Sequence, residues 1–98
     1  MTLNETNKQF FMKLKEEGDK EASIVIHMEY KGCVLRSTIS PDQWIYNNSD
    51  LEIETDEFSL IISLNDAHIG YNAEEDEYIA KVGDISFYFV FLSNDKRG

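Results

Sequence analysis

The clearest structural pattern in the chain is YIAKVGDISFYFVFL, residues 78–92. On both sides of Gly83-Asp84, apolar residues recur at every second position, which is the pattern of two strands joined by a tight turn. In the second strand, Phe87 and Phe89 point to one face. The opposite face, which holds Tyr88, Val90 and Leu92, is also apolar. A strand that is apolar on both faces is typically central in a sheet or covered by a helix. The stretch therefore predicts a β-hairpin whose second strand is either central in a sheet or covered by a helix.

A second hairpin is predicted upstream, over residues 22–39. Apolar residues alternate with polar ones on both sides of Lys31-Gly32. A two-residue turn at this position pairs Tyr30 with Cys33 and keeps the apolar side chains of both strands on one face. Cys33 is then expected to be a small core residue, because a free cysteine is commonly buried.

Two further strands and a short one are indicated in the middle of the chain. Residues 51–56 alternate strictly between apolar and acidic, and the alternation resumes after Asp56-Glu57. A turn at this dipeptide pairs Ile53 with Leu60, again with the apolar side chains on one face. Residues 67–71 have the pattern of a short additional strand.

Two helices are predicted. Thr2 and Glu5 form a capping-box pattern, and apolar residues at helical spacing then continue to a glycine, which predicts a helix over about 3–17. Residues 40–43, Ser-Pro-Asp-Gln, form a second start signal and predict a short helix over about 41–47.

These elements together predict an α+β fold of a single domain, residues 1–98. The N-terminal helix and the second short helix pack on a twisted, mainly antiparallel sheet of about five to seven strands. An apolar fraction of 42% suffices for one core in a chain of 98 residues.

The net charge of −10 comes from one segment of the chain. Residues 1–41 hold equal numbers of acidic and basic side chains, whereas residues 42–80 hold acids and no Lys or Arg. The acids of this segment are Asp42, Asp50, Glu52, Glu54, Asp56, Glu57, Asp66, Glu74, Glu75, Asp76 and Glu77. Excess charge of this kind opposes compaction, and a protein needs far less of it to stay dispersed, so we expect the segment to have a function.

The sequence lacks the residues that several chemical functions require. Cys33 and His27 are the obvious nucleophile and base, but the predicted hairpin points them to opposite faces, with His27 opposite Arg36. One Cys and two His do not make a structural zinc site, and no glycine-rich phosphate loop is present. We therefore expect no enzymatic activity, no metal and no cofactor.

The charge and the hydropathy limit the partners. Direct binding of nucleic acid needs clustered Lys and Arg, and an anionic leaflet repels an acidic surface. No apolar run has the length of a membrane helix, no signal peptide is evident, and the single cysteine fits a reducing compartment. The expected location is the cytoplasm, and the expected partner is a protein with a basic surface. A homodimer is compatible with the sequence.

The acidic segment itself predicts a binding surface. Alternate residues of a strand stand about 6.6–6.8 Å apart, so Glu52, Glu54 and Asp56 form a regular ladder of charge of the same order as the spacing of phosphates along a nucleic-acid strand. A second cluster is expected at a hairpin tip. The candidate partner-binding residues are Glu52, Glu54, Asp56, Glu57, Glu74, Glu75, Asp76, Glu77 and Trp44. Trp44 is either a core residue, which the pattern favours, or an exposed anchor of the interface.

In size, acidity and α+β pattern the chain resembles phage-encoded anti-restriction and anti-CRISPR proteins that imitate DNA. The resemblance is one of general character, and no motif carries specific residues over. It implies an inhibitor, encoded by a phage or mobile element, that occupies the basic nucleic-acid-binding surface of another protein. The hypothesis requires that the acids of residues 42–80 lie on a common, rigid patch.

Other functions fit the same sequence. An immunity protein or antitoxin that neutralises a basic toxin needs the same surface. A sponge for a small ligand such as a nucleotide uses the aromatic residues, with a pocket lined by Trp44 or the tyrosines. A structural component of a phage or plasmid, or acids that only keep strand faces solvated and deter aggregation, need no site at all.

Overall fold

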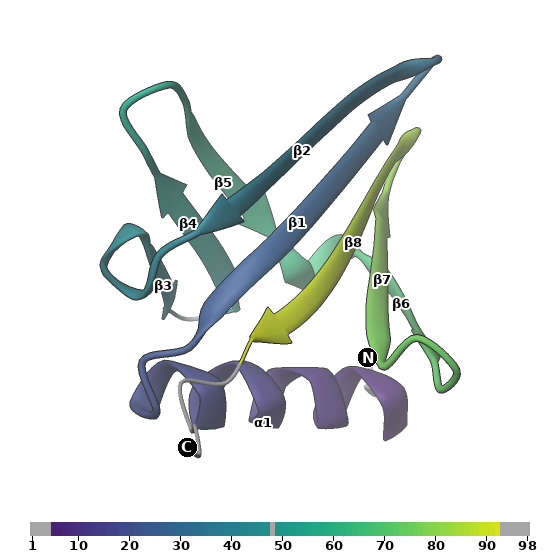
Figure 1. Ribbon diagram of the computed structural model, residues 1–98. Helices are drawn as coiled ribbons and strands as arrows, with labels where there is room; N and C mark the ends of the chain where they lie inside the picture. The colour runs from purple at the N-terminus through teal and green to yellow at the C-terminus, as the bar shows by residue number, and fades with distance from the viewer. Residues whose placement is uncertain (1–4, 48, 93–98) are drawn as a thin grey trace.

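The computed structural model describes residues 5–47 and 49–92, which form an α+β fold of one helix and two antiparallel sheets (Figure 1). The helix is α1 (Glu5–Asp19), which ends two residues later than predicted, and Thr2 and the start of the predicted helix lie outside the described residues. The strands are β1 (Ser23–Tyr30), β2 (Cys33–Ile39), β3 (Trp44–Asn47), β4 (Asp50–Glu54), β5 (Ser59–Ser63), β6 (His68–Asn72), β7 (Glu77–Val82) and β8 (Ile85–Leu92). None of the described helices is long and apolar enough to span a membrane.

The larger sheet has five strands in the order β2-β1-β8-β7-β6. Strand β8 lies between β1 and β7, so of the two predicted placements it takes the central one, and the turn at Gly83-Asp84 joins it to β7. The predicted pairing of Tyr30 with Cys33 is also confirmed. Lys31 and Gly32 both have positive φ, 48° and 82°, as the tight primed turn of a two-residue hairpin requires.

The smaller sheet has three strands in the order β3-β4-β5, with the predicted pairing of Ile53 and Leu60. The prediction of one sheet of five to seven strands is therefore only roughly matched, because eight strands are divided between two sheets. The short strand predicted near residues 67–71 is confirmed as β6, which belongs to the larger sheet.

The predicted second helix over 41–47 is wrong. Only Pro41–Gln43 form a single 3-10 turn, in which the Ser40 N–H donates to Oε1 of Gln43 at 2.9 Å. From Trp44 the chain is extended and pairs with β4. The start signal at Ser40 is genuine, but the following residues alternate between buried and exposed, and this alternation suits a strand.

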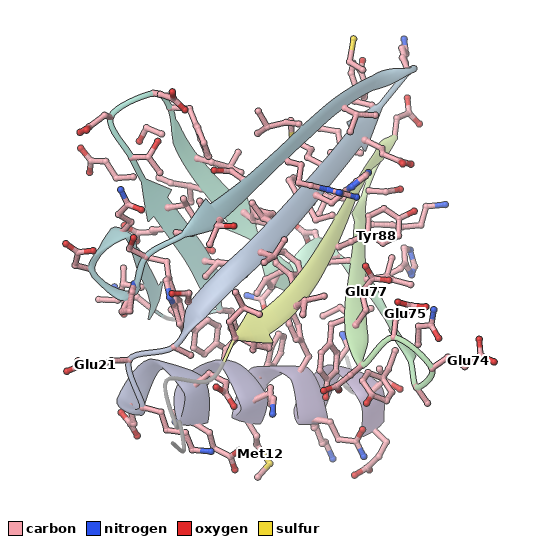
Figure 2. The ribbon with its side chains drawn as sticks, in the orientation of Figure 1. Met12, Glu21, Glu74, Glu75, Glu77 and Tyr88 are labelled. Atoms are coloured by element: carbon pink, nitrogen blue, oxygen red, sulfur yellow. The ribbon has the colours of Figure 1, made fainter. Side chains whose placement is uncertain are left out.

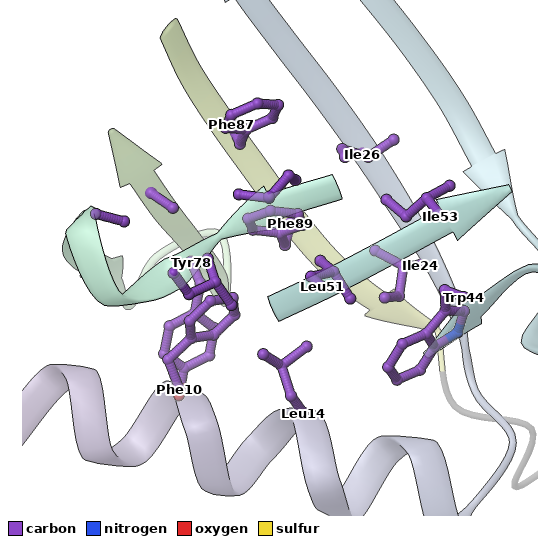
Figure 3. Packing of buried hydrophobic residues seen from close by; sticks show 14 of the residues in the cluster. Phe10, Leu14, Ile24, Ile26, Trp44, Leu51, Ile53, Tyr78, Phe87 and Phe89 are labelled. Carbon is purple, nitrogen blue, oxygen red and sulfur yellow. The ribbon is translucent and has the colours of Figure 1, made fainter. Parts of the chain in front are cut away.

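The core lies between the two sheets, and α1 lies across one end of the space between them (Figures 1 and 3). Phe10 and Leu14 of α1 are fully buried and point toward the strands. The Phe10 ring lies 4.9 Å from the ring of Tyr78 and 5.5 Å from that of Phe89. The helix thus closes the end of the core and does not lie flat on the outer face of a sheet.

The expectation that Cys33 is a core residue is wrong, because its side chain is exposed. Its position in β2 has the inward parity that the pairing with Tyr30 predicts. The β1–β2 hairpin, however, projects past the neighbouring strands at its tip, as Figure 1 shows, so there is no opposite layer for Cys33 to pack against. Tyr30 is 40% exposed for the same reason.

Candidate functional site

The outer face of the three-stranded sheet carries the acidic residues of β4. Leu51 and Ile53 are buried in the core, so Asp50, Glu52 and Glu54 point to the opposite side, as the alternation predicts. Because β4 is the central strand, backbone hydrogen bonds to β3 and β5 hold it on both edges. The three carboxylates therefore project from a rigid backbone.

Two exposed isoleucines flank the central carboxylate. In the register of the sheet, Glu52 lies between Ile45 of β3 and Ile61 of β5. The side chains of Ile45 and Ile61 are 57% and 66% exposed. Neither residue is among the partner-binding candidates that the sequence predicts, because Ile45 falls within the predicted helix and Ile61 is an apolar residue on the outward face of its strand, where a polar one is expected.

A shallow groove of ≈ 480 Å³ runs along this face, beside the 3-10 turn that precedes β3. Carboxylates of Asp42, Glu52 and Glu54 line it together with Ile45 and Ile61. None of the residues that line it is a Lys, Arg or His. We call the groove and the outward side chains of β4 the acidic face. The residues of the acidic face are Asp42, Ile45, Asp50, Glu52, Glu54 and Ile61.

Asp56 and Glu57 do not extend the ladder of β4. The strand ends at Glu54, and the Oγ1 atom of Thr55 accepts hydrogen bonds from the backbone N–H groups of Glu57 and Phe58, both at 3.1 Å. This compact turn removes Asp56 from the alternation that the sequence predicted. Both acids are exposed, and they line a small hollow of ≈ 220 Å³ with residues of β2.

The other predicted cluster lies elsewhere on the molecule. Glu74, Glu75 and Asp76 form the turn between β6 and β7, on the side of the molecule away from β3, β4 and β5 (Figures 1 and 2). Glu77 already belongs to β7, where it pairs with Asn72. The expectation of one common patch for the acids of residues 42–80 is therefore wrong, because the chain that separates the two groups crosses from one sheet to the other.

The β6–β7 turn is also tied into local structure. The Tyr71 hydroxyl donates to Oδ1 of Asp76 at 2.7 Å, and this hydrogen bond raises the pKa of Tyr71. The Tyr71 ring lies 4.7 Å from that of Tyr78, so the two tyrosines pack against each other across the hairpin. A hydrogen bond to Glu17, and to a smaller extent the attraction of Asp76, raises the pKa of Lys13 on α1. Asp76 therefore has a cation nearby.

Trp44 is a core residue, as the pattern favoured. Its side chain is 8% exposed, and its indole N–H donates to the backbone carbonyl of Ala22 at 2.9 Å. Trp44 therefore supports the groove from below and does not act as an exposed anchor.

His27 lies opposite Arg36 on the outer face of the five-stranded sheet, as predicted. Its Nε2 atom is 2.9 Å from Oε2 of Glu29, and the Arg36 guanidinium lies 3.3 Å from its Nδ1. Arg36 can only donate, so Nδ1 accepts and Nε2 carries the proton that is donated to Glu29. Within residues 5–47 and 49–92, no group of three His, Cys, Asp or Glu side chains lies close enough together to hold a metal ion.

Comparisons of the chain with protein-family models, with curated proteins and with solved structures find no match.

Proposed function

We propose that the protein is a small acidic inhibitor that binds the basic nucleic-acid-binding surface of another protein through the acidic face alone. The acids of residues 42–80 do not form the common patch that the sequence-based hypothesis required, so the proposed binding site is this smaller surface and excludes the acids of the β6–β7 turn. The observation that carries the proposal is the groove on the three-stranded sheet, where three carboxylates and two exposed isoleucines meet without a cation. A surface that gathers like charge around exposed apolar groups is costly in a free monomer, and a cationic partner relieves that cost.

The chemistry of the acidic face matches Arg and Lys side chains. Their aliphatic stems pack on apolar groups while the charged ends reach carboxylates, and Ile45 and Ile61 beside Glu52 offer both partners within one row of the sheet. Because β4 is held on both edges, little ordering accompanies binding. The surface is small, so we infer contact with one basic segment and not with the full length of a duplex-binding channel.

The net charge of −10 acts at longer range. It steers a basic partner toward the protein and speeds association at low ionic strength. Screening shortens this reach to about 10 Å at 0.1 M salt, so the association rate should fall steeply as salt rises.

The experiment that tests the proposal is affinity capture of basic proteins from a cell lysate, followed by competition. Proteins retained by the wild-type chain at low salt should elute with added double-stranded DNA or RNA, since the nucleic acid and the acidic face occupy the same surface. If the retained proteins have no nucleic-acid-binding activity, and neither polymer displaces them, the proposal is wrong.

An immunity protein or antitoxin would use the same face. The identity of the captured protein separates the two functions, because a toxin loses its activity when bound and need not bind nucleic acid. In that outcome the acidic face remains the binding site while the class of partner changes.

One observation favours the alternative of a small-ligand sponge. A groove of ≈ 540 Å³ between α1 and β3 is lined by Lys8, Lys15, Phe11 and Tyr46, among others. The rings of Phe11 and Tyr46 lie 5.9 Å apart, so aromatic surface lies near two cations, as an anionic aromatic ligand such as a nucleotide requires. Thermal stabilisation by ATP or AMP that is lost in K8E/K15E would favour this function, and no stabilisation by either would remove it.

A further inference from the structure

The outer face of the five-stranded sheet has an apolar centre that no described element covers. Tyr88 alternates with the core residues Phe87 and Phe89 and lies on the outer face, where it pairs with His27 and Ile79 (Figure 2). In the next row, Val90 pairs with Val25. The helix lies across the ends of the strands and leaves this face open among residues 5–47 and 49–92 (Figure 1).

The charges on this face are balanced, unlike those of the whole chain. The outward positions of the five strands carry two acids and two bases, namely Glu29, Glu77, Arg36 and Lys81. The chain as a whole has a net charge of −10, so most other approaches of a second copy meet repulsion. We propose that two copies of this chain associate through the outer face of the five-stranded sheet, as a two-fold symmetric dimer.

The register of the sheet supplies the symmetry that such a dimer needs. Ser86 of β8 pairs with Glu29 of β1 on one side and with Lys81 of β7 on the other. A two-fold axis nearly parallel to β8, in the plane between two faces, exchanges the two sides. It places Glu29 of one copy against Lys81 of the second copy, twice in each dimer, as an isologous interface requires.

Within one copy, no ion pair joins these two side chains among the described residues. They lie two strands apart, at about 9.6 Å, because neighbouring strands are about 4.8 Å apart. Glu29 is bonded to His27, and no ion pair of Lys81 is found in the described part of the chain. Lys81 is exposed and therefore available to a second copy.

The same axis avoids a clash at the edges of the sheet. Arg36 and Gly70 stand at the two ends of the row of paired residues that has Tyr88 at its centre, each two strands from β8. The axis therefore places Arg36 of one copy over Gly70 of the second copy. No atom lies within 4 Å of the position that a Cβ of Gly70 would take, so the long arginine has room. At the centre, Tyr88 and Val90 pack against their equivalents at the aligned angle of about 30° that twisted sheets adopt.

The area of the face determines how strongly two copies can associate. Five strands about 4.8 Å apart and about six residues long give a face of roughly 24 by 20 Å. Two such faces bury roughly 1,000 Å² in total, which is the lower end of specific interfaces. The dimer should therefore be reversible and depend on concentration.

Charge exchange at the Glu29–Lys81 contact tests the dimer, with sedimentation velocity from micromolar to millimolar concentration as the readout. We expect the dimer fraction of wild type to rise with concentration. K81E and E29K should each weaken association by about tenfold or more, since each places like charges together, and E29K/K81E should restore it. K15E changes the net charge as K81E does but lies on α1, so it should associate as wild type does.

Two results would overturn the dimer: a wild-type chain that stays monomeric over the whole range, or a double exchange that fails to restore what the single exchanges lose. If K81E does not fold, as judged by circular dichroism, Tyr88→Lys replaces it, and unchanged association of that variant would equally exclude this face. The acidic face lies on the other sheet, so this outcome is independent of the proposed inhibitor function.

Discussion

At the scale of single residues, Trp44 shows how far side-chain chemistry could be predicted. Its size and its position after a start signal indicated a core residue, and it is buried. Its hydrogen-bond partner, the Ala22 carbonyl, lies 22 residues away in sequence, and no local pattern could indicate that contact. The prediction that Cys33 is a core residue was wrong for the opposite reason. Its side chain is on the predicted face of the strand, but the second layer of the fold does not reach the hairpin tip.

We expect Trp44→Phe to destabilise the fold by about 2 kcal/mol, because it leaves the buried Ala22 carbonyl without its donor and removes part of a packed ring. Urea denaturation measures the change. Ile45→Ala is the matched control in the next residue, with a side chain 57% exposed, and should cost no more than about 0.5 kcal/mol. Equal losses in the two variants would contradict the assignment of Trp44 to the core.

Three titrating groups give an alkaline limit to stability. The hydrogen bond to Glu17, at 3.1 Å, raises the pKa of Lys13, burial raises the pKa of Tyr78, and the hydrogen bond to Asp76 raises the pKa of Tyr71. All three groups hold their protons more tightly in the folded state. The unfolded chain therefore binds fewer protons above about pH 10, and the free energy of unfolding should fall as pH rises through that range.

Urea denaturation at successive pH values between neutrality and pH 11 checks this limit. Tyr78→Phe should flatten the decline because it removes one titrating group, and Lys13→Arg should flatten it because the arginine stays charged. A decline of the same slope in wild type and in both variants would show that other groups cause it.

At the scale of elements, the hairpins could be predicted and the third strand could not. The three correct hairpins combine alternation with a turn, and Lys31-Gly32 has the positive φ angles that its turn demands. Strand β3 has only four residues, Trp44–Asn47, and follows a genuine helix-start signal. Only its pairing with β4 decides its conformation, and that pairing depends on the tertiary structure.

The turn after β4 positions the end of the acidic face. Thr55→Val removes the oxygen that accepts from the N–H groups of Glu57 and Phe58. We expect a loss of about 1 kcal/mol and faster hydrogen exchange in β4 and β5, measured by NMR. Thr55→Ser keeps the acceptor and should restore most of the protection. Unchanged exchange in Thr55→Val would show that the strand pairing alone holds the loop.

At the scale of the whole molecule, the division into two sheets could not be predicted from the sequence. Alternation reports that a strand has one buried face, but it is the same whether that face meets a helix or another sheet. The split placed the acids of β4 on one side and those of the β6–β7 turn on another, which corrected the predicted single patch (Figure 2). The acidic face remains because its parts come from three neighbouring strands and from the 3-10 turn before β3.

We expect the acidic face, and not the net charge, to bind the basic partner. Two charge-reversed variants, E52K/E54K and E74K/E75K, change the net charge equally on two different sides of the molecule. The measurement is the affinity of each for a basic, nucleic-acid-binding protein captured by wild type, by titration calorimetry at a fixed salt concentration. We expect E52K/E54K to bind about 100-fold more weakly and E74K/E75K to stay within about threefold of wild type. Equal weakening in the two variants, or a larger loss in E74K/E75K, would contradict this expectation.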